Sequence, residues 1–100
     1  MTRDEAVKLL ADSRSKIDQI DLAILDLLNQ RTRVVEDIGR AKEGCGVPIY
    51  EPKREEDVFY NLTTHNQGPL PPDALRRIFE RIMDEMRSLQ RMRREQKGAS

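Results

Sequence analysis

The first 43 residues contain no proline and a single glycine, Gly39, so they form the longest uninterrupted stretch of the chain. A ladder of mostly apolar side chains at seven-residue spacing runs along it through Leu10, Ile17, Ile24, Arg31 and Ile38. This pattern predicts a helix over 3–43 with one apolar stripe. Such a helix is roughly 60 Å long, whereas a compact domain of this size has a radius of gyration of only ~13 Å. The remaining residues cannot cover the stripe, and a second copy of the chain is the simplest cover.

Prolines and glycines divide the rest of the chain into two further predicted helices. The breaks fall at 44–48, with Gly44 expected to end the first helix, and at 66–72. Pro52 suits the first turn of a short helix that ends near Asn66, and Pro72 suits the first turn of a third helix. We find no convincing strand, so the expected fold is all-α, with a long, a short and a long helix. We expect one domain over 1–100, in which the basic segment 91–100 extends the last helix and then frays.

Composition excludes several classes of function. The 18 basic and 18 acidic side chains cancel, which argues against a nucleic-acid or membrane-surface binder. One cysteine and one histidine supply neither a disulfide framework, a zinc site nor a catalytic triad, so we expect no metal and no cofactor. Neither a membrane-spanning run nor a signal peptide is evident, and we therefore expect a cytoplasmic protein.

Cations that interrupt the apolar stripe are the candidate functional groups. Arg31 and Lys42 are eleven residues apart, about three helical turns, so they project from one face, roughly 16 Å apart along the axis. Arg54 and Glu55 open the next helix, which can fold back toward them. Gln90 continues the apolar face of the last helix, where a buried amide needs a partner. Together these residues suggest a site for a small anion.

Arg14 fits this site only through a second subunit. It precedes Arg31 by 17 residues, hence by roughly 25 Å along the helix, and it points about 100° away from that face. No small ligand spans this distance. If Arg14 serves the same kind of site, it serves the site of the other subunit in an antiparallel dimer.

The residues that carry these features resemble a known family. The segments are RSKIDQID at 14–21, ILDLLNQR at 24–31, VEDIGRAK at 35–42, PIYEPKRE at 48–55, IFERIM at 78–83 and SLQ at 88–90. In their order, spacing and total length they resemble the all-helical AroQ-class chorismate mutases over 5–90. The resemblance implies an intertwined homodimer of three-helix chains that converts chorismate to prephenate on the route to phenylalanine and tyrosine.

The resemblance also assigns roles to residues. It implies that Arg14 of the partner chain, Arg31 and Lys42 of the long helix, and the Arg54–Glu55 pair contact the substrate. It implies the same for Gln90, and the family often has an acidic residue where Glu51 stands. The family commonly places a small residue one turn before the glutamine, where this chain has Met86, so one hydroxyl contact to substrate is in doubt.

The family reaction is a [3,3] rearrangement within one molecule, which needs neither a nucleophile nor a proton transfer. Arginines suit the two carboxylates of the substrate because a guanidinium binds a carboxylate with two hydrogen bonds. We assign the hydrogen-bond donors for the ether oxygen to Lys42 and Gln90, and the acceptor for the ring hydroxyl to Glu55. Two alternatives remain open at this point: an isochorismate-pyruvate lyase of the same fold, and a helical dimerisation or regulatory module without catalysis.

Overall fold

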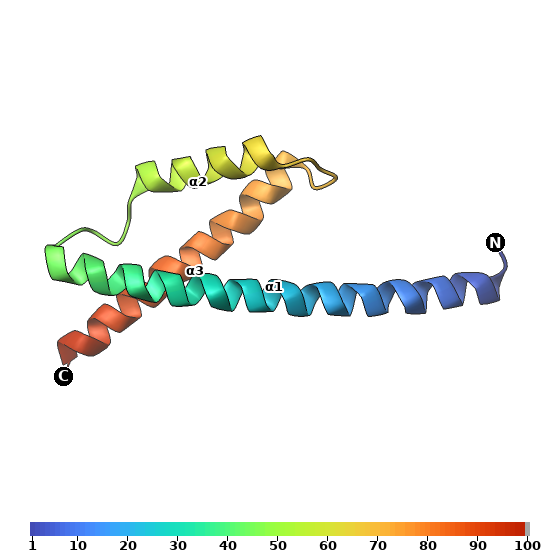
Figure 1. The fold of residues 1–100 in the computed structure, drawn as a ribbon, viewed down its shortest axis with the longest axis horizontal. Coiled ribbons are helices and arrows are strands. Elements are labelled where there is room, and N and C mark those ends of the chain that lie inside the picture. Colours follow the sequence, from blue (N-terminus) through green and yellow to red (C-terminus); the bar gives the residue numbers. More distant parts are fainter. Residues whose placement is uncertain (100) are drawn as a thin grey trace. The chain divides into compact units, whose positions relative to one another are not determined.

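The computed structural model describes residues 1–99 and consists of three α-helices (Figure 1). They are α1 (Arg3–Cys45), α2 (Pro52–His65) and α3 (Pro72–Ala99), and residues 1–99 contain no strand. The predicted all-α order of a long, a short and a long helix is therefore confirmed. None of the helices in this described part has a stretch both long and apolar enough to cross a bilayer. As expected, α3 continues past Gln90. Ser100 lies outside the described residues, so the expected fraying of this end stays a prediction.

The chain divides into two compact units, Met1–Val34 and Val35–Ser100. The first unit consists of most of α1. The second contains the last turns of α1 together with α2 and α3, and it holds six of the eight predicted site residues.

A reciprocal pair of hydrogen bonds starts α1. The backbone N–H of Glu5 donates to the Thr2 hydroxyl at 3.1 Å, and the backbone N–H of Thr2 donates to the Glu5 carboxylate at 3.3 Å. This capping box satisfies N–H groups that the first turn of a helix leaves without partners. It explains why the helix begins at Arg3.

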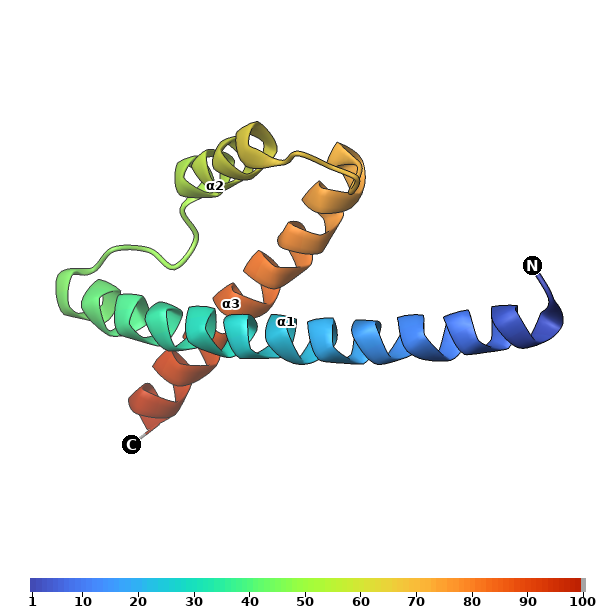
Figure 2. The same cartoon turned by 45° about the vertical axis from the view of Figure 1, so that its right-hand side comes forward.

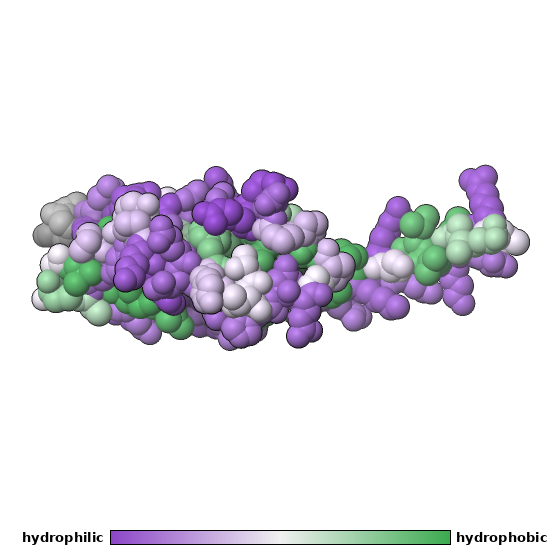
Figure 3. All heavy atoms as spheres, turned by 90° about the horizontal axis from the view of Figure 1, so that it is seen from above, coloured by the Kyte–Doolittle hydropathy of each residue, from purple (hydrophilic) through white to green (hydrophobic). Residues whose placement is uncertain are grey.

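No residue of the first unit is buried, although its sequence is rich in large apolar side chains. Ile17, Ile20 and Leu22 are 54%, 54% and 66% exposed, and Ile24 and Leu27 are 49% and 61% exposed. Figure 3 shows apolar surface along the N-terminal part of α1, at the right of the view. The stripe predicted from the sequence is thus present and uncovered within this unit.

The C-terminus of α1 differs from the prediction by two residues. The sequence predicts an end at Gly44, but the helix continues through Cys45 and the chain turns at Gly46, which has φ 73°. A residue without Cβ adopts this left-handed conformation at little cost. The N–H of Val47 then donates to the Lys42 carbonyl at 3.2 Å, which closes the last turn. The sequence has a glycine at both 44 and 46, and only the backbone geometry shows that the chain turns at Gly46.

In the second unit, α2 and α3 form a helical hairpin (Figures 1 and 2). α2 ends at His65, close to its predicted end, because Asn66 leaves the helix with ψ 114°, before Gly68 is reached. The Asn66 side chain then accepts from the Gly68 N–H and donates to the Leu70 carbonyl, both at 2.9 Å. The buried core of the chain is small and lies in this unit; it consists of Val35, Phe59, Leu75 and Met83.

Candidate active site

Lys42 lies in the last turn of α1 and points at the segment that leads into α2. Its ammonium donates to the Ile49 carbonyl at 2.9 Å and lies 3.5 Å from the Glu51 carboxylate. The Lys42 side chain is only 12% exposed. A lysine this buried needs such partners, because an unpaired charge is costly away from water. The structure therefore brings together two of the predicted site residues, Lys42 and Glu51.

Glu51 stands at the N-cap position of α2 but does not cap the helix with its side chain. Its backbone carbonyl accepts from the Glu55 N–H at 3.1 Å, and Pro52 follows in the first turn. Proline is tolerated there because the first turn lacks intrahelical partners for its N–H groups. The Glu51 carboxylate is thereby left for Lys42.

Three consecutive residues of this segment contact two different helices. The Ile49 carbonyl and the Glu51 carboxylate face Lys42 of α1, whereas the Tyr50 ring lies against Arg87 of α3. The guanidinium carbon of Arg87 is 5.1 Å from the centroid of the Tyr50 ring, a cation–π distance. The segment 49–51 thus ties the end of α1 to the middle of α3.

Glu55, in the first turn of α2, forms an ion pair with Arg87 of α3. The two side chains are 23% and 21% exposed, so the pair is largely shielded from water. The second terminal nitrogen of Arg87 pairs with Asp84, one turn earlier on α3. The hydrogen bond with Glu55 raises the pKa of the Arg87 guanidinium, while its burial acts in the opposite direction. Since arginine is already charged at every ordinary pH, Arg87 is a permanent cation of the site.

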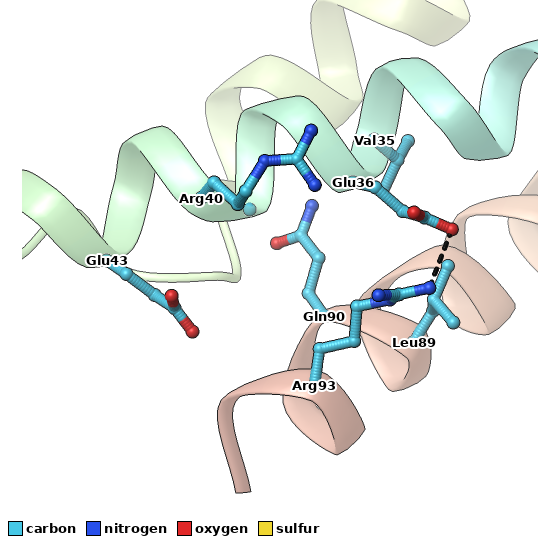
Figure 4. Close-up of a pocket in the computed structure, with 8 residues that line it drawn as sticks. Val35, Glu36, Arg40, Glu43, Leu89, Gln90 and Arg93 are labelled. Atoms are coloured by element: carbon cyan, nitrogen blue, oxygen red, sulfur yellow. Dashed lines mark ion pairs between the residues drawn. The ribbon is translucent and has the colours of Figure 1, made fainter. Parts of the chain in front are cut away.

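Gln90 of α3 lines a cavity of about 190 Å³ beside α1 (Figure 4). Its side-chain oxygen is buried and has no hydrogen-bond partner among the described residues. The stem of the side chain lies over Gly39, where an added Cβ would come within 3.5 Å of Cγ of Gln90. An ion pair of 2.9 Å between Glu36 and Arg93 closes one side of the cavity. Of the predicted site residues, Gln90 alone lines it.

The other predicted site residues differ in their exposure to solvent. Arg54 is exposed in the first turn of α2, and Met86 is half-buried on α3. Arg14 and Arg31 belong to the first unit, where Arg14 is exposed and Arg31 is half-buried. Within the second unit the structure joins Lys42 to Glu51, and it joins Glu55 to an arginine that the sequence analysis did not select.

That arginine, Arg87, could have been placed on the correct face from its spacing. It follows Met83 by four residues and precedes Gln90 by three, so all three lie on one side of α3. Nothing in the sequence separates it from the other arginines of this helix, because a charged residue beside an apolar face usually extends into solvent. Its partner Glu55, 32 residues away, is visible only in the fold.

Comparison with known proteins agrees with this architecture. The family model described as chorismate mutase type II matches residues 13–91. A solved chorismate mutase (form II) from Thermus thermophilus superposes with a TM-score of 0.80 at 36% identity, and the match covers 82% of this chain and 93% of that one. The chorismate mutase of Methanocaldococcus jannaschii is 38% identical over 53 residues, which are 53% of this chain and 54% of that protein.

Other relatives are longer proteins with two activities in their names. The bifunctional chorismate mutase/prephenate dehydratase of Neisseria gonorrhoeae is 39% identical over 84 residues, 84% of this chain. The chain spans only 23% of the length of that relative. The shared part therefore corresponds to a fraction of the longer protein, whereas it corresponds to almost all of the Thermus chain. On the evidence of the family match, the helical order and the likeness to the Thermus enzyme, this chain belongs to the type II chorismate mutase family.

Proposed function

We propose that the chain catalyses the rearrangement of chorismate to prephenate. The observation that carries this proposal is the match of residues 13–91 to the type II chorismate mutase family, which spans every predicted site residue. The Neisseria relative and the Thermus structure, which match 84% and 82% of this chain, bear the mutase name, and none of the proteins compared above is named as an isochorismate-pyruvate lyase. The proposed compartment is the cytoplasm, where a single thiol such as Cys45 stays reduced.

In the proposed mechanism the protein holds the substrate dianion in the folded conformation from which one bond breaks as the other forms. Holding a reactive geometry supplies up to ~7–11 kcal/mol in favourable intramolecular reactions. Arg31, Arg54 and the partner's Arg14 bind the carboxylates. Their fixed guanidinium donors match carboxylate oxygens in pairs.

Lys42 is the proposed donor to the ether oxygen, which gains negative charge as its bond to carbon breaks. An ammonium group has three N–H donors. Two of these donors face the Ile49 carbonyl and the Glu51 carboxylate, whose oxygens lie 2.9 and 3.5 Å from the Lys42 nitrogen. These contacts orient the third donor before substrate binds, which is the kind of preorganisation that stabilises a transition state more than a ground state.

Gln90 is the proposed second donor to the ether oxygen, and Glu55 is the proposed acceptor for the ring hydroxyl. An amide keeps its N–H donors at any ordinary pH, whereas a carboxyl in the same position would first need a proton. The proposed donor is the amide NH₂ group, whereas the buried side-chain oxygen, which has no partner among the described residues, can only accept a hydrogen bond from a ligand. The half-buried Met86 is proposed to contribute apolar contact only.

A homodimer is part of the proposal. The uncovered stripe of the first unit supports it, since apolar side chains such as Ile17 and Leu22 are more than half exposed in the single chain. Two copies that pack these stripes together bury them and bring Arg14 of one chain to the site of the other. The expected product is an intertwined helical bundle with two equivalent sites.

The deciding experiment supplies the purified chain with chorismate and, separately, with isochorismate. We expect prephenate from the first and no salicylate from the second. Salicylate formation would identify a lyase instead. An inactive but dimeric chain would identify a helical association module.

A further inference from the structure

Arg87 is more shielded from water than the other arginines of α3 for which the described part of the chain gives an ion pair. Arg76, Arg81 and Arg93 have side chains 58%, 77% and 53% exposed. Arg87 is 21% exposed. Its partners come from two helices and from the segment before α2: Glu55, Asp84 and Tyr50. A charge buried to this degree on an apolar helix face is expensive unless several groups offset it.

Both ends of the guanidinium are already engaged. One terminal nitrogen donates to Glu55 and the other to Asp84, while the Tyr50 ring covers one face. Asp84 fixes the rotation of the guanidinium because it lies one turn back on the same helix. Arg87 therefore limits how the Glu55 carboxylate can rotate, because Arg87 is itself held by Asp84 and by the Tyr50 ring.

We propose that Arg87 is a positioning residue that orients the Glu55 carboxylate toward the ring hydroxyl of the substrate. This role rests on the proposed mutase function. A direct contact between Arg87 and a substrate carboxylate is the competing possibility, because Glu55 and Asp84 occupy only two of the five N–H donors of the guanidinium. The existing contacts favour action through Glu55.

The proposal predicts that Arg87 and Glu55 act as one unit. Prephenate formation is measured for the wild-type chain, Arg87→Met, Glu55→Gln and the double variant. Methionine keeps the apolar stem of the side chain and removes the charged donors. Because small misplacements of a contact group are costly, Arg87→Met is expected to lower kcat/KM by about 10- to 100-fold. The double variant should be no worse than Glu55→Gln alone, since the residue that Arg87 orients is already altered.

Two further variants separate positioning from a structural role. Arg87→Lys keeps a charged donor for Glu55 and should recover part of the lost kcat/KM. Asp84→Asn weakens the clamp on Arg87 and should lower kcat/KM less than Arg87→Met does. Arg81→Met is the matched control, because it removes an arginine of the same helix whose partner Glu85 lies on the surface. We expect Arg81→Met to keep wild-type kinetics, and thermal melts should show every variant folded.

The outcomes are distinguishable. Wild-type kinetics in Arg87→Met would overturn the positioning role and leave the mutase function intact. A further large loss when Arg87→Met is added to Glu55→Gln would also overturn it, since Arg87 would then act independently of Glu55. No prephenate from the wild-type chain would overturn the proposed function, and the positioning role with it.

Discussion

Lys42 and Glu51 are joined by a 3.5 Å ion pair between the last turn of α1 and the residue that precedes α2. The hydrogen bond from Lys42 to the Ile49 carbonyl adds a second tie to the same segment. Lys42, the proposed donor to the transition state, is therefore oriented by the segment that leads into α2, where Arg54 and Glu55 are proposed to contact the substrate.

The first prediction concerns Lys42→Ala. Loss of one preorganised donor to a developing oxyanion costs about 10²–10³ in kcat in well-studied enzymes, and we expect a loss of this size. The fold should survive because the buried core lies elsewhere, at residues such as Phe59 and Met83. Steady-state kinetics and circular dichroism measure the two effects. Lys53→Ala, an exposed lysine of α2, is the control, and full activity in Lys42→Ala would remove our role for this side chain.

The second prediction tests whether subunits share a site. Arg14→Ala and Lys42→Ala chains are each expected to be nearly inactive alone. After unfolding, mixing in equal amounts and refolding, half of the dimers are mixed, and each mixed dimer has one site with both residues intact. About a quarter of the wild-type activity should return. Absence of any recovery would contradict an Arg14 contributed by the partner.

The third prediction concerns assembly. Ile17→Glu places a charge on the exposed apolar stripe of the first unit, where burial against a second copy would make it unfavourable. We expect the molar mass from light scattering to fall toward that of a monomer. Gln19→Glu adds the same charge on the opposite side of the helix and should leave the mass unchanged. A dimer that tolerates Ile17→Glu would place the interface elsewhere.

The fourth prediction is stabilisation by an anionic ligand. Arginine and lysine side chains gathered around one pocket repel each other, and a dicarboxylate offsets that repulsion. A stable dicarboxylate analogue of the transition state at 100 times its Kd should add about 2.7 kcal/mol of stability and raise Tm. The dimethyl ester of the same analogue is the control, since it lacks the charges. A Tm that stays constant at saturating analogue would argue against the proposed cation cluster.

The sequence predicts the helices well because their signals are local. Pro52 and Pro72 mark helix starts, and the seven-residue ladder predicts both the length of α1 and its uncovered stripe. For Lys42, the sequence predicts only that the following segment can fold back toward it. It does not predict the ion pair between Lys42 and Glu51. The end of α1 at Cys45, just before the turn at Gly46, was missed because Gly44 offers the same local signal as Gly46 two residues earlier.

The pairing of Arg87 with Glu55 was missed for a different reason. It depends on how α2 packs against α3, and no property of one residue encodes it. Periodicity places Arg87 on the inner face of α3, yet periodicity cannot say whether a long cationic side chain stays inside or extends to water. Contacts between distant segments are thus the part of the site that only the fold supplies.

The unburied first unit has a consequence for how this protein holds together. A helix gains most of its stability from packing its apolar face, and no residue of 1–34 is buried in the single chain. In the proposed dimer, ordering of this helix and association of two chains become a single equilibrium, so Tm rises with protein concentration. Dilution is then expected to abolish the proposed activity by separating the two chains, and specific activity measured at nanomolar and micromolar protein would report the dissociation constant of the dimer.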